Sequence, residues 1–356
     1  MRLRYPAVVD MAYAASAPMK FYGQEVDEYA YYTRVTESAE RSMAGCAAAV
    51  KSAFAQFESF VADASVEQIA ERFAVCSPLS PSENKEQLAD DLEFLAQQTF
   101  ANLNMANYPP DNRTAMYRTC GNFVSAAARG GSAPMNAIRS LLLTETLRIS
   151  KSRGPGRALL RSVDLEEQAP KACFDLAAHL PSGDSASARC GDWSGCGNSH
   201  DGEMWDYQTC SFEVEQIGFG SATQMFPDRP WTKEWLREHC QRRFGTQPQP
   251  LALQSLWGFD EENLKAQASR IVFTNGLNDG WSVGGILKDL SPERGLLTIN
   301  LPNGAHHSDL AHDFGEVDTP DVQAAHAKLI AVIGQWLKDV RSELGVVSAV
   351  DSTVVI

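Results

Sequence analysis

The stretch FTNGLNDGWSVGG, residues 273–285, contains Gly280-Trp281-Ser282-Val283-Gly284, which satisfies the G-x-S-x-G pattern of a hydrolase nucleophile. That pattern requires a strand that runs directly into a sharp turn, followed by a helix. The apolar residues 271–273 predict such a strand. Residues 274–280, however, are rich in Asn, Asp and Gly and predict a loop. The meaning of Ser282 therefore depends on the residues that follow it.

A second polar segment lies downstream, after an apolar stretch that predicts a strand over 296–301. Asp279 follows the first of these strands and His306 follows the second. Open α/β sheets carry their functional groups at the carboxyl ends of their strands. In α/β-hydrolases the order along the chain is Ser, then Asp or Glu, then His. We therefore expect Asp279 and His306 to be the acid and the base, and Ser282, which follows the acid, not to be the nucleophile.

Other interpretations of these residues stay open from the sequence alone. Asp often occupies a turn after a strand, and a single His is often a surface residue. The segment is also dense in metal-ligand types, namely His306, His307, Asp309, His312 and Asp313. Adjacent His residues after a strand point to opposite sides and do not easily chelate one ion, so we expect no metal here.

The totals describe an ordinary globular protein. The chain has 356 residues, 44% of them hydrophobic and 21% charged, enough for two domains or for one domain with a large insertion. A net charge of -14 and the absence of a basic cluster argue against a nucleic-acid partner and suit an acidic compartment. Apolar runs are too short for a membrane-spanning helix.

The cysteines indicate an oxidising compartment. There are eight, from Cys46 to Cys240. Cys190 and Cys196 are close enough for a local disulfide, and a zinc knuckle with His200 is the alternative. Asn112 begins an Asn-Arg-Thr sequon, which predicts glycosylation.

Periodicity divides the rest of the chain into elements. Residues 7–15 predict a strand instead of a signal peptide, because Asp10 interrupts the apolar run. Helical spacing continues from about 36 to 150, and a further helix is predicted over 230–244. A last long helix is predicted from Thr319, which we expect to cap it. Its expected apolar face consists of Val322, Leu329, Ile330, Ile333, Trp336, Leu337 and Val340.

Four motifs together resemble the serine peptidase family of lysosomal Pro-X carboxypeptidase and dipeptidyl peptidase II. Asn275–Gly285 is similar to the family's Asn-Gly-x-x-Asp-Pro-Trp-Ser-Gly-Gly-Gly, and Gly304–Leu310 to its Gly-Ala-His-His-x-Asp-Leu. Trp205–Cys210 is similar to Trp-x-Tyr-Gln-x-Cys, and Arg4–Pro18 to the segment that follows the nucleophile helix. Gly280 stands where the family has Pro, and Ala311 where an Arg is common.

The resemblance implies an α/β-hydrolase fold that is incomplete, with the late strands only, and a large disulfide-bonded helical insertion or cap domain. The implied boundaries are 1–20 for a remnant of the hydrolase domain, 21–204 for the helical insertion, 205–344 for the carboxyl-terminal half of the hydrolase domain, and 345–356 for a tail. The family's Gly-Gly-Ser-Tyr-Gly-Gly nucleophile segment would lie upstream of residue 1. We therefore expect the chain alone to be inactive.

The implied activity is a serine-type exopeptidase that cleaves after proline in peptide substrates. Asp279 would orient His306, His306 would be the general base and acid, and Trp281 would line the pocket for the proline ring. The motifs do not distinguish a carboxypeptidase from a dipeptidyl peptidase. No cofactor is implied, a homodimer is compatible, and the implied location is lysosomal, vacuolar or secreted. The alternatives are a non-catalytic relative that acts as a binding or scaffold protein, and a metal-dependent hydrolase.

The family's pattern also implies a disulfide framework. Its pairs would be Cys46 with Cys120, Cys76 with Cys173, and Cys210 with Cys240, with Cys190 and Cys196 as the remaining pair.

Overall fold

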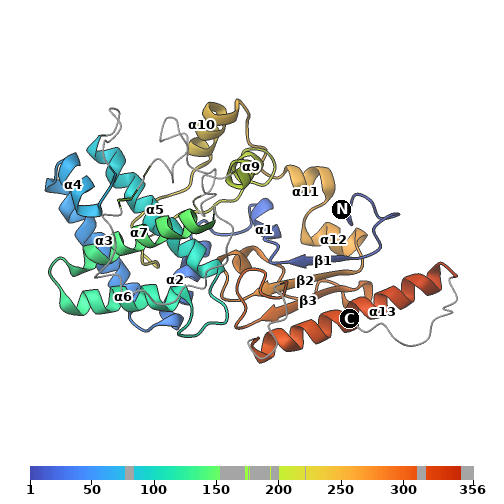
Figure 1. Cartoon of the computed structure of the whole chain (residues 1–356). Coiled ribbons are helices and arrows are strands. Elements are labelled where there is room, and N and C mark those ends of the chain that lie inside the picture. Colours follow the sequence, from blue (N-terminus) through green and yellow to red (C-terminus); the bar gives the residue numbers. More distant parts are fainter. Residues whose placement is uncertain are drawn as a thin grey trace.

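A computed structural model describes most of the chain, and Figure 1 shows its arrangement. The described residues are 1–76, 84–152, 173–174, 176, 193, 200–220, 222–310 and 318–345, with the backbone alone for 144–152 and 200–201. No helix in these ranges is long and apolar enough to cross a bilayer.

Three parallel strands form the sheet, in the order β1-β2-β3. They are β1 (Ala12–Ala15), β2 (Ile271–Gly276) and β3 (Leu296–Leu301). Ala12 pairs with Ile271, which in turn pairs with Leu296, so the strands are closely aligned at their amino ends. The expected strand over 7–15 is thus shorter than predicted. Residues before it form turns, whose carbonyls at Pro6 and Val9 accept hydrogen bonds from the Arg2 side chain.

Helices cover both faces of the sheet, which explains why β2 is apolar throughout its first half. Side chains alternate between faces along a strand. Ile271 and Phe273 pack with Leu264 of α12 (Glu261–Gln267), whereas Val272 packs on the opposite side against α13 (Pro320–Glu343). The long α13 runs along one face of the sheet in Figure 1.

The predicted helix after Thr319 is present, with Thr319 at its N-cap position, but the cap lacks one interaction and the buried face is narrower than predicted. Thr319 occupies the N-cap position without a capping hydrogen bond from its side chain. Val322, Leu329 and Trp336 are buried, whereas Ile330 is 65% exposed and Leu337 is 44% exposed. Each follows a buried residue by one position, a rotation of about 100° that carries it off the buried stripe.

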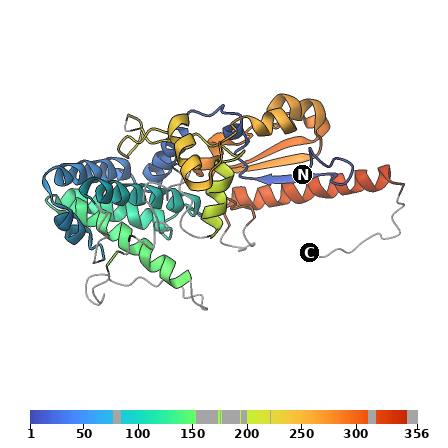
Figure 2. The same cartoon turned by 90° about the horizontal axis from the view of Figure 1, so that it is seen from above.

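Among the described residues, six helices form the largest region, which lies to one side of the sheet in Figures 1 and 2. They begin at residue 30, earlier than the predicted 36. Cys46–Cys120 joins two of them, α3 and α6. Their bounds are α2 (Ala30–Ser42), α3 (Cys46–Asp63), α4 (Val66–Phe73), α5 (Lys85–Met105), α6 (Ala115–Arg129) and α7 (Ala133–Ser152).

Short elements connect the helical region to the sheet. Thr232 caps α10 by accepting a hydrogen bond from the Trp235 N–H at 3.1 Å, so the predicted helix begins three residues later than Pro230. The remaining elements are α1 (Met19–Tyr22), α9 (His200–Thr209), α10 (Lys233–Phe244), α11 (Ala252–Trp257), and the 3₁₀ helices η2 (Gly280–Gly284) and η3 (Pro292–Arg294).

Candidate active site

The segment after β2 does not form a sharp strand-to-helix turn at Ser282. The strand continues to Gly276, past the point where a loop was predicted, and η2 begins at Gly280. Ser282 is 2% exposed, and its hydroxyl donates a hydrogen bond to the Asp279 carbonyl at 2.7 Å. The hydroxyl is therefore part of the loop's internal structure.

The Asp279 carboxylate lies next to the His306 imidazole. Oδ2 of Asp279 is 2.7 Å from Nδ1 of His306, and Oδ1 accepts a hydrogen bond from the Trp281 N–H at 3.1 Å. The Asp279 side chain is 1% exposed and that of His306 is 25% exposed. A carboxylate only accepts hydrogen bonds, so Nδ1 carries a proton, and in the neutral form of the imidazole Nε2 has a free lone pair. No hydroxyl among the described residues is hydrogen-bonded to this Nε2.

Backbone contacts hold the two loops together. The Leu277 N–H donates to the Leu301 carbonyl at 2.9 Å, and the Asn278 N–H donates to the Gly304 carbonyl at 3.0 Å. Gly276 makes this approach feasible, because a Cβ there would lie 2.2 Å from the Ala305 carbonyl oxygen. The two loops therefore lie together at the carboxyl ends of β2 and β3, the strands that the sequence places before Asp279 and His306.

Helical residues also contact these loops, and the sequence analysis did not find them. The Arg34 guanidinium donates to the Leu277 carbonyl at 2.6 Å. Asn104 contacts the loop on either side of Asp279, and the Met105 carbonyl accepts a hydrogen bond from the His306 N–H at 3.3 Å. They lie far from the loops in sequence, and no local motif marks them.

His307 lies beside His306, with 3.9 Å between ring centroids. Burial lowers the pKa of His307, and the adjacent His306 lowers it further. Its backbone N–H donates to the Ser16 hydroxyl at 3.1 Å, directly after β1. This contact connects the His306 loop to the residue that follows β1.

The proposed alternative of a metal site receives no support from these contacts. Asp309 accepts hydrogen bonds from the hydroxyls of Tyr13 and Thr274, while His312 and Asp313 lie outside the described residues. Within the described ranges, one group of three ligand types is close enough to hold an ion, but it lies elsewhere and includes a disulfide-bonded cysteine. Its members are Asp206, Cys210 and His239.

Trp281 is part of an aromatic cluster beside the Asp279 loop. Its ring is 5% exposed and makes edge-to-face contacts with Phe21, Tyr31 and Trp205 at centroid distances of 5.8, 5.0 and 5.7 Å. Such a cluster is a rigid apolar wall. Tyr31 also approaches Gly280, where a Cβ would lie 2.8 Å from the Tyr31 ring.

The disulfides and the sequon are distributed over the helical part of the chain. Cys46 bonds to Cys120, Cys76 to Cys173 and Cys210 to Cys240, the pairs that the resemblance implies. Cys190 and Cys196 lie outside the described residues, as does the side chain of His200, so the local disulfide and the zinc knuckle stay predictions. Asn112 is exposed.

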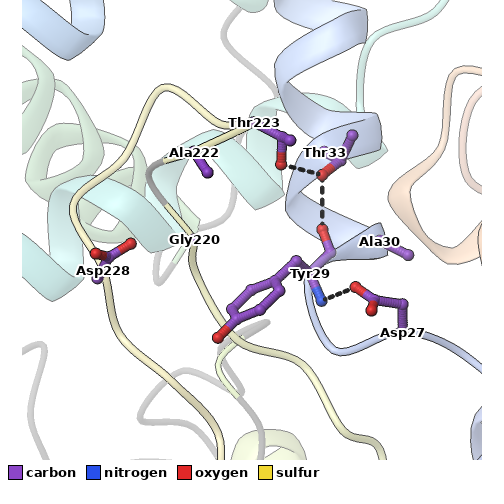
Figure 3. Close-up of a pocket in the computed structure, with 8 residues that line it drawn as sticks. All are labelled: Asp27, Tyr29, Ala30, Thr33, Gly220, Ala222, Thr223 and Asp228. Carbon is purple, nitrogen blue, oxygen red and sulfur yellow. Dashed lines mark hydrogen bonds between the residues drawn. The ribbon is translucent and has the colours of Figure 1, made fainter.

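A separate hollow lies at the amino end of α2, and Figure 3 shows its lining. Thr33 donates to the Tyr29 carbonyl at 2.9 Å and approaches the Thr223 hydroxyl at 3.3 Å. Asp27 and Asp228 give it negative charge. Burial raises the pKa of Tyr29, and neighbouring carboxylates raise it further. Neither Asp279 nor His306 lines this hollow.

A parallel sheet covered by helices, with a carboxylate and an imidazole paired at the carboxyl ends of adjacent strands, is the arrangement of the α/β-hydrolase class. A profile of the serine carboxypeptidase S28 family matches residues 1–139 and 159–329. The chain belongs to this family.

Individual relatives are distant. Lysosomal Pro-X carboxypeptidase of Bos taurus is 24% identical over 340 residues, 95% of this chain and 60% of the relative. The human protein of the same name is 24% identical over 346 residues, 97% of this chain and 62% of the relative. Thymus-specific serine protease of Mus musculus is 24% identical over 355 residues, which cover 96% of this chain and 61% of the relative. The chain thus spans about three fifths of the length of these relatives.

Proposed function

We propose that Asp279 and His306 are the acid and base of a serine exopeptidase that cleaves peptides after proline. The observation that carries the proposal is the 2.7 Å hydrogen bond between Asp279 Oδ2 and His306 Nδ1, in a pair whose carboxylate is buried and whose imidazole is partly exposed. The family membership of the chain and the names of its relatives support the same reaction class.

In this mechanism the nucleophile is a serine hydroxyl supplied from outside the described residues. His306 Nε2 accepts the hydroxyl proton as the serine oxygen attacks the carbonyl carbon of the scissile bond. The same proton then passes from Nε2 to the leaving amine as the peptide bond breaks. Asp279 keeps the proton of the imidazole on Nδ1 and stabilises the imidazolium while Nε2 carries the second proton.

Trp281 and the rings packed around it are proposed as the apolar wall of the proline subsite. Their support is positional, since Trp281 follows the acid by two residues and its backbone N–H binds the acid's carboxylate. A rigid aromatic surface suits a rigid apolar ring. The disulfides and the acidic composition support a lysosomal, vacuolar or secreted location.

The test compares the 356-residue chain with a version that carries an amino-terminal extension containing the family's nucleophile segment. We expect no peptidase activity from the chain alone, and release of proline-containing products by the extended protein. A serine-directed fluorophosphonate should abolish that activity, and a zinc chelator should not. Activity of the unextended chain that the fluorophosphonate removes would contradict the proposal.

Substrates with one blocked end distinguish the two exopeptidase types. Cleavage of an amino-blocked Pro-Phe peptide indicates a carboxypeptidase. Cleavage that requires a free amino end and releases an Xaa-Pro dipeptide indicates a dipeptidyl peptidase. Equal cleavage of peptides blocked at both ends would contradict exopeptidase activity.

A further inference from the structure

The carboxyl end of α5 lies against both loops of the candidate active site. Asn104, the penultimate residue of this helix, is 0% exposed. Its Nδ2 donates a hydrogen bond to the Asn278 carbonyl at 2.7 Å, and its Oδ1 accepts one from the Gly280 N–H at 2.7 Å. The two contacted groups are the carbonyl of the residue before Asp279 and the N–H of the residue after it.

These two contacts determine the orientation of the side-chain amide. A backbone carbonyl only accepts and a backbone N–H only donates, so each end of the Asn104 amide has one compatible partner. A carboxamide holds its donor and its acceptor at a fixed separation. The bonds therefore restrain the peptide groups on both sides of Asp279 and, through them, the direction in which its carboxylate leaves the backbone.

The next residue of the helix contacts the other loop. The Met105 carbonyl accepts a hydrogen bond from the His306 N–H at 3.3 Å. Carbonyls in the last turn of a helix lack partners within the helix, so this one is available to the loop. One helix end thus contacts the backbone of the acid through Asn104 and the backbone of the base through Met105.

We propose that Asn104 is a positioning residue that holds the Asp279 carboxylate in hydrogen-bonding geometry with His306. A role of Asn104 in catalysis rests on the proposed function, but its effect on the position of the Asp279 carboxylate does not. Burying an amide without partners is costly, and here both of its ends are paired to the loop that carries the acid.

The first experiment measures the hydrogen bond directly in the 356-residue chain. With the histidines labelled with ¹⁵N, the Nδ1 proton of His306 should give a resonance far downfield of the amides, assigned by its loss in His306→Gln. In Asn104→Ala we expect this proton to exchange with water faster by about tenfold or more, because two restraints on the acid are removed. Circular dichroism verifies that the variant is folded.

Asn107→Ala is the matched control. Asn107 follows α5 closely, is 1% exposed, and donates to the hydroxyls of Ser38 and Ser42 at 3.3 and 3.0 Å, with no hydrogen bond to the described residues of either loop. Its removal should leave the His306 resonance unchanged. If Asn104→Ala does not fold, Asn104→Asp carries the test, since it keeps the shape and the acceptor for Gly280 but loses the donor to Asn278.

The outcomes separate this proposal from the proposed function. The positioning role is wrong if the His306 Nδ1 proton has the same chemical shift and the same exchange rate in the Asn104 variants as in Asn107→Ala. In the extended protein, Asn104→Ala should lower kcat on the order of 10²-fold with little change in KM, as expected when a catalytic group is misplaced. An extended protein that is inactive in every form, but whose resonance responds to Asn104, would overturn the proposed function and leave the positioning role standing.

Discussion

The loops after β2 and β3 meet the helices α2 and α5 at the same site, but different interactions hold the loops and the helical region in place. The loops are positioned by strand pairing, since Ile271 to Gly276 of β2 align residue by residue with Leu296 to Leu301 of β3. The helices are positioned by a core of large buried side chains and by disulfides that join distant parts of the chain. Asn104, which belongs to the helices, forms hydrogen bonds with the loop after β2.

Because different interactions position them, the two regions should respond differently to substitution. Changes in the loops should alter chemistry with small effects on stability, whereas changes among the helices should alter stability first. Asn104 is the expected exception, because it belongs to the helices and contacts the acid's loop.

Replacing the acid or the base in the extended protein should have the largest consequence. We expect Asp279→Asn to lower kcat on the order of 10⁴-fold, because the imidazole can then adopt the wrong tautomer, and His306→Ala to remove the base outright. Steady-state kinetics on a proline-containing peptide measures both. Near-normal kcat in either variant would show that the paired residues are not the catalytic acid and base.

Removing the Cys46–Cys120 disulfide should weaken the helical region. The bond closes a separation of 74 residues, for which the chain-entropy treatment gives a loss of about 4 kcal/mol in the free energy of unfolding. The Cys210–Cys240 bond closes 30 residues and should contribute less. Denaturant unfolding of the double Cys→Ala variants measures both losses. A larger loss for the shorter loop would contradict this ranking.

Stability should also depend on pH through Glu93 of α5. Burial raises the pKa of Glu93 to about 7, Glu58 and Asp90 add to the increase, and Arg229 opposes it. The folded state therefore binds this proton more tightly than the unfolded state, so its contribution is complete below pH 4.5 and is lost as the pH rises toward 7.

The corresponding experiment compares unfolding free energies of wild type and Glu93→Gln from pH 4 to pH 8. The difference between them should change by up to about 3 kcal/mol over this range, with the wild type losing stability as the pH rises. Glu86→Gln, at an exposed position of the same helix, is the control and should follow the wild type. A difference independent of pH would contradict the assignment to Glu93.

Ser282→Ala should have the smallest effect. It removes one buried hydrogen bond to the Asp279 carbonyl, so we expect a loss of about 1 kcal/mol in the free energy of unfolding and most of kcat retained. Unfolding and kinetics on the same preparation give both values. Complete loss of turnover in a normally folded Ser282→Ala variant would indicate that Ser282 is the nucleophile.

The elements predicted from sequence are largely present because their signals are local. The strand over 296–301 has its predicted bounds, since an apolar run between turn residues defines a buried strand. The strand before Asp279 extends further than predicted because residues 274–276 pair with residues 299–301 of β3, where the Asn275 side chain also donates to the Ile286 carbonyl and to Asn300. A sequence pattern does not indicate that two polar residues on different strands will pair with each other.

The order of the motifs along the chain was enough to predict that an acid and an imidazole follow successive strands in hydrolase order, and that Ser282 is out of order. Parallel pairing carries the carboxyl ends of neighbouring strands to one edge of the sheet, so residues that follow successive strands are expected there. Which helices hold these loops is visible in the folded structure alone, where Asn104 and Met105 of α5 and Arg34 of α2 contact them. Their contacts join residues far apart in the chain, and such pairings depend on how whole helices pack rather than on any local pattern.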